Sequence, residues 1–328
     1  MTTVDVSIVM CSRNRANLLR DAMLSLVAQE TDGGFTYELL IVDNASTDHT
    51  ADVIADVAAS TQVPIRSVYE GTAGQVVARN RGLREARGEW IANFDDDQIA
   101  EPSWLKELMR VAREHHARSV GGTLYLKLTD GCQRTLALQV RRLLGESVLW
   151  DRVTPYTRTQ GPGSGNQLLH SSIFEEIGVY DESYQLRAYD TDLYRRMRAA
   201  GVESWFAPKA VAHHVTPPSR LEESYLQETA LHSAWSFARR DAAEWGAVKP
   251  ILVAAARVVQ AMLSHTPQLW LARLLKRDET VLGLRCRRWR AEGYARCVLY
   301  ATAPAVFSQP GFFSRFEFRA TAQSLPGH

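Results

Sequence analysis

The chain has 328 residues, of which 45% are hydrophobic and 23% are charged, and its formal net charge is +1. This composition excludes a disordered or fibrous protein and predicts a full hydrophobic core in one large or two moderate domains. The near-zero charge gives no global field that favours a nucleic-acid partner. The four cysteines are far apart and form no CxxC pair, which argues against a zinc knuckle or a disulfide framework and suits the cytoplasm.

The first half of the chain alternates strand-like and helix-like segments. Residues 4–12 and 37–44 are short, β-branched runs that predict strands, whereas residues 15–29 and 47–60 have apolar positions at helical spacing. This order predicts βαβ units on a mostly parallel sheet. In such sheets, ligands bind beyond the carboxyl ends of the strands.

Polar residues gather after three of the predicted strands, which include "EWIANF" at 89–94. They are Ser12, Arg13 and Asn14, then Asp43, Asn44 and Ser46, and finally Asp95, Asp96 and Asp97. Three strand ends that converge on polar groups predict a binding crevice. An alternative for Ser46 or Thr47 is an N-cap of the next helix, but Asp43 lies too early for that role.

The three adjacent carboxylates at 95–97 are the strongest single signal. Three like charges disfavour ionisation of one another, so they need a positive partner. If the strand continues, Asp95 and Asp97 point the same way and Asp96 points elsewhere. Such a pair suits Mg²⁺ or Mn²⁺ carrying a diphosphate, because these ions prefer oxygen ligands. A structural cluster, with one aspartate capping the helix expected at 101–116, is the alternative.

Several ordered motifs resemble those of family 2 glycosyltransferases with the GT-A fold. The matching segments begin "VSIVMCSRNRAN", "ELLIVDNASTDHT", "AGQVVARNRGLRE" and "GSGNQLLHSSIF". The resemblance covers residues 4–220. It implies an inverting transfer of a sugar from a nucleotide-diphosphate donor to an acceptor hydroxyl, with Mn²⁺ or Mg²⁺ on the diphosphate. The implied setting is cell-surface polysaccharide, glycolipid or secondary-metabolite glycosylation, with a glycan, lipid-linked or small-molecule acceptor.

The expected architecture is a Rossmann-like α/β GT-A domain over residues 1–220, with a mostly parallel sheet flanked by helices. Long helical patterns follow Pro218, so residues 221–328 are expected to form a mainly helical C-terminal extension.

The resemblance also implies roles for single residues in donor binding. Asp43 would contact the nucleobase, Ser12 and Arg13 would surround the same nucleoside, and Arg79 would lie near the nucleotide. The DxD pattern fits Asp95 and Asp97 as metal ligands, and a shifted register gives Asp96 one of their contacts.

The segment "GSGN" resembles a glycine-rich turn before a helix that faces the donor sugar and the acceptor. Gly165 and Asn166 are therefore site candidates, although a simple turn explains them equally well.

Inversion requires a base opposite the leaving diphosphate, to take the proton of the acceptor hydroxyl. The segment "RAYDTDLYRRM" resembles the acidic motif of the family, with Tyr189 where a glutamate is usual and Asp190 at the aspartate position. We therefore predict Asp190 as the base and Tyr189 as part of the donor-sugar or acceptor site. The alternative is that Asp190 or Asp192 only caps the following helix.

The segment "VAHHV" supplies candidate metal ligands. If Val211 and Val215 face the core, then His214 faces the cleft, and His213 is the second candidate. Arg220, just beyond two prolines, would neutralise the departing diphosphate.

The C-terminal extension has a local excess of positive charge. Ten basic and three acidic residues lie between Lys249 and Arg296, interleaved with apolar residues. This pattern predicts peripheral binding to an anionic membrane surface through residues 265–320, and a solvated basic face is the alternative. No transmembrane helix is expected, because the longest apolar stretch is shorter than the roughly 20 residues needed.

Two other functions remain open. A non-catalytic glycan- or nucleotide-binding relative is compatible with Tyr189. A sugar-phosphate nucleotidyltransferase is disfavoured, because "CSRNRAN" after the first strand contains no glycine.

Overall fold

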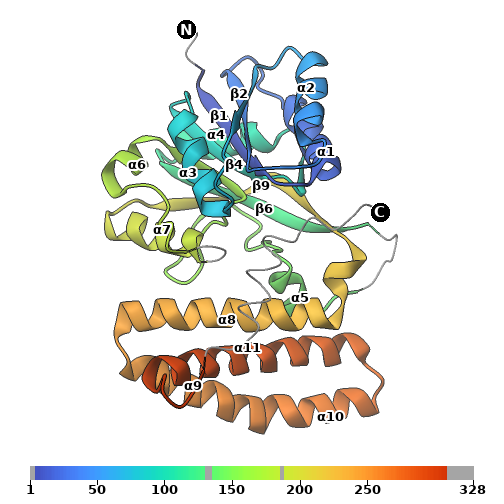
Figure 1. Ribbon diagram of the computed structural model, residues 1–328, viewed down its shortest axis with the longest axis vertical. Helices are drawn as coiled ribbons and strands as arrows, with labels where there is room; N and C mark the ends of the chain where they lie inside the picture. The colour runs from blue at the N-terminus through green and yellow to red at the C-terminus, as the bar shows by residue number, and fades with distance from the viewer. Residues whose placement is uncertain (1–3, 130–134, 185–187, 309–328) are drawn as a thin grey trace. The chain divides into compact units, whose positions relative to one another are not determined.

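The computed structural model describes residues 4–129, 135–184 and 188–308 (Figure 1). These residues form two compact units. The first comprises residues 4–125 and 147–215, and the second comprises residues 126–146 and 216–308.

A mixed sheet organises the first unit. Its strand order is β3-β2-β1-β4-β8-β6-β9-β5, and β7 pairs with β9. The strands β3, β2, β1 and β4 are parallel, whereas β8 is antiparallel to both β4 and β6. The α/β class is therefore confirmed. The strands are β1 (Val6–Ser12), β2 (Tyr37–Asp43), β3 (Ile65–Tyr69), β4 (Trp90–Asp95), β5 (Gln98–Ala100), β6 (Ser119–Leu128), β7 (Thr154–Pro155), β8 (Asn166–His170) and β9 (Ser204–Thr216).

Helices cover both faces of this sheet. Side chains alternate along a strand, so Ile8 and Met10 of β1 belong to one apolar cluster and Val9 belongs to the other. One face carries α1 (Ala16–Val27), α2 (Thr50–Ala59) and α4 (Trp104–Glu114). The other carries α3 (Gln75–Glu85), α6 (Ser172–Ile177) and α7 (Tyr189–Ala199).

The loops after β1 and β2 are tied together. Asn14 adopts a positive φ of 52°, its backbone N–H donates to Ser46 Oγ at 3.1 Å, and its Oδ1 accepts from the backbone N–H of Thr47 at 2.7 Å. Because α2 begins only at Thr50, the expected N-cap role of Ser46 or Thr47 is wrong. These two residues instead fix the loop beside the carboxyl end of β1.

The second unit is helical, as expected for the C-terminal region. It contains α5 (Leu138–Leu143), the 3₁₀ turn η1 (Pro218–Leu221), α8 (Glu223–Trp245), α9 (Val248–Gln260), the π-helical turn η2 (Ala261–His265), α10 (Thr266–Leu274) and α11 (Asp278–Thr302). Trp235 of α8 packs in one buried cluster with Tyr294 and Cys297 of α11. Among the described residues, no helix combines the length and the apolar character needed to cross a membrane.

Gly82 allows α3 to lie close to the sheet. A Cβ atom at this position would lie 2.3 Å from Val9 Cγ1 and 3.3 Å from Val42 Cγ2. Alanine gains about 1 kcal/mol of helix propensity over glycine, but overpacking a closed core costs about 1–3 kcal/mol. Since Val9 and Val42 are fully buried, the steric cost is the larger effect.

We predict that Gly82→Ala lowers the free energy of unfolding by about 1–2 kcal/mol, measured by urea denaturation. Gly163→Ala is the matched control, because a Cβ there meets no atom within 4 Å. A Gly82→Ala protein as stable as the wild type would show that α3 has room to move away from the sheet.

Candidate functional site

The carboxyl ends of β1, β2 and β4 lie side by side in the sheet. Ser12 is in register with Asp43, and Cys11 is in register with Asp95. The polar residues that follow these strands in the sequence are therefore brought to one edge, as the crevice prediction requires.

The aspartates do not follow strand alternation. The strand β4 ends at Asp95, and Asp96 and Asp97 form the turn that leads into β5. Arg15 Nη1 lies 2.8 Å from Asp96 Oδ1 and 3.4 Å from Asp97 Oδ2. The condition that the strand continues through Asp97 is wrong, because β4 ends at Asp95 and a turn follows. Strand alternation therefore does not apply to Asp95 and Asp97, and Arg15 joins Asp96 to Asp97.

Asp96 is held on two sides. Ser12 Oγ donates to its Oδ2 at 2.7 Å, opposite the contact of Arg15 with its Oδ1. Burial and the adjacent Asp97 raise the pKa of Asp96, while Arg15 and Ser12 lower it, and the net shift is upward. The Asp96 carboxylate in turn raises the pKa of Arg15. Arg15 and Asp96 are therefore a closely coupled ion pair at this edge of the sheet.

Asp95 has a separate positive partner. Its Oδ1 forms an ion pair with Arg79 Nη2, and Arg79 is 2% exposed. Arg79 Nε donates to the hydroxyl of Tyr189 at 3.3 Å, and Ser164 Oγ donates to the same hydroxyl at 3.0 Å. Burial raises the pKa of Tyr189, so its phenol is neutral. Arg79 is therefore fixed in the core with its guanidinium group against Asp95.

The expected role of Tyr189 in the donor-sugar or acceptor site stays a prediction. Its side chain is 5% exposed, and its hydroxyl receives two hydrogen bonds. It positions Arg79, which positions Asp95.

His214 lies beside the aspartate turn. Its Nε2 is 3.3 Å from Asp97 Oδ2, and β5 pairs with β9 so that Gln98 is opposite His214. The condition that Val211 and Val215 face the core is wrong, because both valines are half-buried whereas Ala212 is fully buried.

His213 has different neighbours. Its Nε2 lies 3.0 Å from Glu101 Oε1, and its ring stacks on Tyr125. Since adjacent residues of a strand point to opposite sides, His214 is the histidine that lies with Asp97.

Asp97 and His214 suit a divalent ion that also binds a diphosphate. Among the residues that the structure describes, no group of three or more histidine, cysteine, aspartate or glutamate side chains is arranged to hold a metal ion. Mg²⁺, however, is usually bound by one or two protein groups together with substrate phosphates and water, and Mn²⁺ accepts imidazole. The two donors fit this arrangement. Asp95, the other predicted ligand, instead faces Arg79.

Position 165 requires glycine, because its backbone lies close to the side chain of Asp95. A Cβ atom at Gly165 would lie 1.9 Å from Asp95 Oδ2. Asn166 is 5% exposed, its Oδ1 accepts from Trp104 Nε1 at 2.7 Å, and its Nδ2 donates to the carbonyl of Thr123 at 2.9 Å. The "GSGN" segment precedes the strand β8 and not a helix, which corrects that expectation. Asn166 therefore anchors the turn in the core, and its role toward a donor sugar or an acceptor stays a prediction.

Asp190 lies in the first turn of α7. It is half-buried, and its Oδ1 accepts from the backbone N–H of Thr191 at 2.7 Å. Asp192 is buried and forms ion pairs of 2.8 Å with both Arg195 and Arg196. The two carboxylates therefore have distinct environments, and Asp192 is occupied by structural contacts.

The remaining predicted residues are placed as follows. Arg13 is half-buried in the loop after β1. Asp43 Oδ1 accepts from the backbone N–H of Ser46 at 3.0 Å. Arg220 belongs to η1 in the second unit, so its role at the diphosphate stays a prediction.

Sequence reasoning missed Arg15 and Ser164, and it named Asn44 among the polar residues after the second strand without giving it a role. Asn44 is buried, donates to the carbonyls of Glu70 and Thr72, and accepts from the N–H of Gly74, which fixes the loop before α3. A second arginine in "SRNR" was the available signal for Arg15. Nothing local to the sequence marked Ser164.

Comparison with known proteins identifies relatives of the chain. Residues 7–178 match the family described as glycosyl transferase family 2. The succinoglycan biosynthesis protein ExoO of Rhizobium meliloti is 34% identical over 128 residues, which cover 39% of this chain and 35% of that protein. The chain spans 39% or less of the length of the first relatives that it matches.

Two solved structures share the fold. Residues 1–349 of S. aureus TarS in complex with UDP align at a TM-score of 0.50 and 15% identity over 92% of each chain. GalNAc-T7 with UDP, GalNAc and Mn²⁺ aligns at a TM-score of 0.52 and 16% identity, over 66% of this chain and 44% of that one. At these identities the likeness concerns the fold alone, and the predicted GT-A fold is confirmed.

We predict that Arg15→Gln lowers the free energy of unfolding by about 1–3 kcal/mol in EDTA, because Asp96 and Asp97 lose a charged hydrogen-bond donor. Arg20→Gln is the control, since Arg20 pairs with Asp56 at the exposed surface and should change stability by about 0.5 kcal/mol or less. Urea denaturation of both variants measures the difference. Equal effects would mean that Arg15 is not a main partner of the aspartates.

Proposed function

The chain belongs to glycosyl transferase family 2, and we propose that it transfers a sugar, with inversion, from a nucleoside-diphosphate sugar to an acceptor hydroxyl. The observation that carries this proposal is the gathering of Ser12, Arg15, His214 and the 95–97 aspartates at the carboxyl ends of β1 and β4. An anionic donor with a metal-bound diphosphate matches this mixture of cations and carboxylates.

Binding of the donor is assigned to the first unit. Asp43 and the Ser12–Arg13 loop would bind the nucleoside, and Asp95, held by the buried Arg79, would hold the nucleotide beside them. Asp97 and His214 would hold Mn²⁺ or Mg²⁺. When bound, the ion would neutralise the diphosphate and so assist its departure. That GalNAc-T7 is described with UDP and Mn²⁺ supports this choice.

Arg15 has a second role in this scheme. Its guanidinium group contacts Asp96 and Asp97, so it supplies positive charge that the two carboxylates need. A diphosphate bound beside Asp97 would lie near Arg15. Arg15 would then turn from Asp97 toward the diphosphate.

Asp190 is the proposed base. It is the half-buried carboxylate at the start of α7, and α7 also carries Tyr189, which supports the Arg79–Asp95 pair. Asp190 would take the proton of the acceptor hydroxyl as its oxygen attacks the anomeric carbon. Asp192 is unsuitable, because two arginines hold it.

We also propose a pathway and a location. ExoO is named for succinoglycan biosynthesis, and TarS is described with UDP, which favours a UDP-sugar donor and an acceptor in polysaccharide biosynthesis. We propose that the protein acts in the cytoplasm at the inner face of the cell membrane, with Arg220 assisting departure of the diphosphate.

We predict that Asp97→Asn removes the Mn²⁺-dependent part of UDP binding, because the ion loses its anionic ligand. Isothermal titration with UDP in Mn²⁺ and in EDTA measures this part directly. The control Asp52→Asn changes an exposed carboxylate of α2 and should bind UDP as the wild type does. Unchanged affinity of Asp97→Asn in Mn²⁺ would refute the assignment of the metal to Asp97.

For Asp190→Asn we expect the opposite result, with UDP affinity kept and transfer reduced by about 10²–10⁴-fold, the usual contribution of a general base. Release of UDP from the donor in the presence of an acceptor measures the rate. Asp181→Asn, which removes an exposed carboxylate before α7, should retain the wild-type rate. Wild-type turnover by Asp190→Asn would assign the base to another residue.

A further inference from the structure

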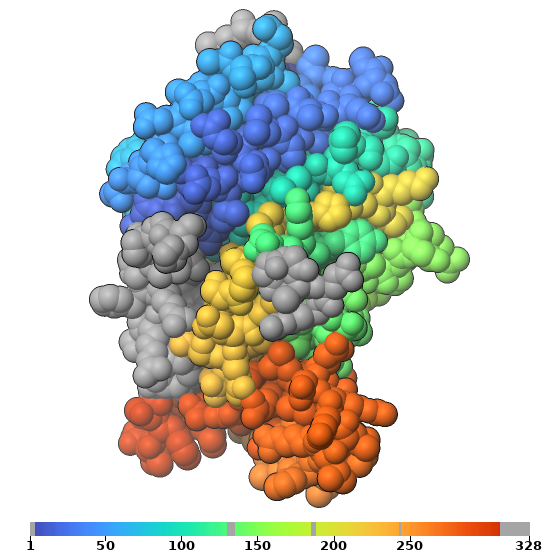
Figure 2. Space-filling model, turned by 90° about the vertical axis from the view of Figure 1, so that its right-hand side faces the viewer, coloured from blue at the N-terminus to red at the C-terminus, as the bar shows by residue number. Residues whose placement is uncertain are grey.

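Exposed apolar side chains concentrate on one continuous helical rod of the second unit, formed by α9, η2 and α10. Leu263 is 75% exposed and Leu274 is 80% exposed. Nine of the nineteen large apolar side chains exposed among the described residues belong to this rod, and a tenth, Leu275, follows directly after it. Part of the rod is seen in orange in Figure 2. These ten side chains are Val248, Ile251, Leu252, Val259, Met262, Leu263, Trp270, Leu271, Leu274 and Leu275.

The π-helical turn η2 aligns these residues into one stripe. A π-turn accommodates one extra residue, which sets the following residues back by about 100° around the helix axis. Without it, Leu271 and Leu275 would rotate away from the face that holds Leu252 and Val259. With it, the residues of α10 continue the face of α9, while Leu269 and Ala272 stay buried on the inner side.

The same rod carries only positive charge. Its residues 248–274 contain Lys249, Arg257 and Arg273 and no aspartate or glutamate, and Lys276 and Arg277 follow it before Asp278 and Glu279 begin α11. Arg257 lies over the ring of Tyr294, and Lys249 lies over the ring of Trp245. Arg273, Lys276 and Arg277 are exposed at the end of α10, and within the described part of the chain none of them forms an ion pair.

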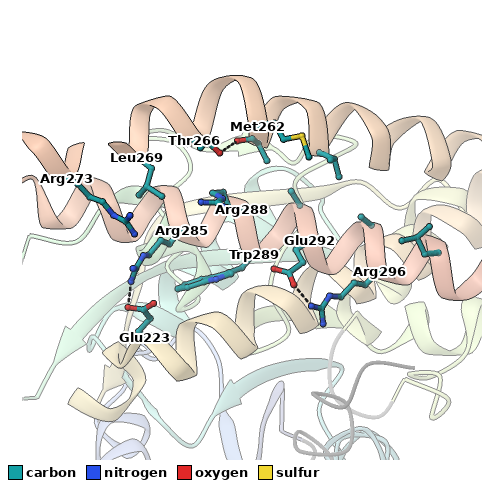
Figure 3. A pocket seen from close by; sticks show the side chains of 15 residues that line it. Glu223, Met262, Thr266, Leu269, Arg273, Arg285, Arg288, Trp289, Glu292 and Arg296 are labelled. Atoms are coloured by element: carbon teal, nitrogen blue, oxygen red, sulfur yellow. Dashed lines mark hydrogen bonds and ion pairs between the residues drawn. The ribbon is translucent and has the colours of Figure 1, made fainter. Parts of the chain in front are cut away.

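A groove of about 530 Å³ adjoins the stripe. Met262 belongs to both, and the groove also contains Leu269, Trp289 and four arginines. Two of these arginines are neutralised, since Arg285 pairs with Glu223 and Arg296 pairs with Glu292 (Figure 3). The other two are Arg273 and Arg288, which have no ion pair within the described residues.

We infer that the apolar stripe and this groove together form a docking surface for a membrane that contains anionic phospholipid. The stripe enters the boundary between headgroups and acyl chains, and Arg273 and Arg288 bind a lipid phosphate at its edge. A second copy of the chain fits this face poorly, because a two-fold contact would bring two positively charged faces together. This inference is independent of the sugar-transfer reaction.

The docking surface extends over residues 248–288. The sequence pattern placed it at 265–320, and of that segment "GFFSRFEF" lies outside the described residues. The exposure of Ile251, Leu252 and Val259 identifies α9, which lies before residue 265, as part of the same face.

The test is co-sedimentation of the purified full chain with phosphatidylcholine vesicles, with and without phosphatidylglycerol. We expect binding to the anionic vesicles that is at least tenfold stronger than to neutral ones and that weakens at high salt. Leu263→Ser/Leu274→Ser should reduce this binding at least tenfold. Both side chains are at least 75% exposed, so the fold should tolerate their loss. Leu24→Ser/Val179→Ser, at exposed apolar positions of the first unit, is the matched control.

Charge is tested with a second pair of variants. Arg273→Gln/Arg288→Gln should weaken binding to anionic vesicles, whereas Arg84→Gln/Lys209→Gln, which removes two exposed cations of the first unit, should not. Equal binding to neutral and anionic vesicles, or none to either, would overturn the inference. So would competition by soluble glycerol phosphate at low millimolar concentration, which would indicate a site for a soluble phosphate. Self-association that the Leu263→Ser/Leu274→Ser variant abolishes would assign the face to a second copy.

Discussion

The carboxylates of Asp95, Asp96 and Asp97 lie together at the end of β4, and the site depends on the cations that hold them there. Arg79 pairs with Asp95 from the core side, and Arg15 joins Asp96 to Asp97 from the loop after β1. Three adjacent negative groups would otherwise repel one another. The positive partners therefore come from the chain itself, whereas the sequence pattern alone suggested only a metal ion.

Close packing around Arg79 and Asp95 sets the position of this ion pair. Tyr189 and Ser164 hold Arg79 in the core, so α7, which carries the proposed base Asp190, is linked to β4 through side chains. On the other side of Asp95, only a glycine fits at position 165. Tyr189, at the position where the resemblance implies a glutamate, is a neutral side chain that holds Arg79.

Local sequence signals predicted most of the first unit. The β-branched runs of β1 and β2 and the helical spacing of α1 and α2 depend on residues close in sequence, and the parallel order then brought Ser12 and Asp43 together. Long-range contacts were not predictable in this way. Arg15 meets Asp96 across 81 residues, and Arg79 meets Tyr189 across 110. The burial of Asn166 and Tyr189 likewise depends on tertiary packing, which local pattern does not encode.

The central claim is that the turn after β4 binds a metal-bound nucleoside diphosphate. A crystal structure of the chain with UDP and Mn²⁺, with the metal located by its anomalous scattering, tests it most directly. We predict Mn²⁺ at roughly 2.0–2.2 Å from Asp97 and His214, with diphosphate oxygens completing its coordination. A UDP molecule bound elsewhere, or a metal ion that contacts neither residue, would contradict the account.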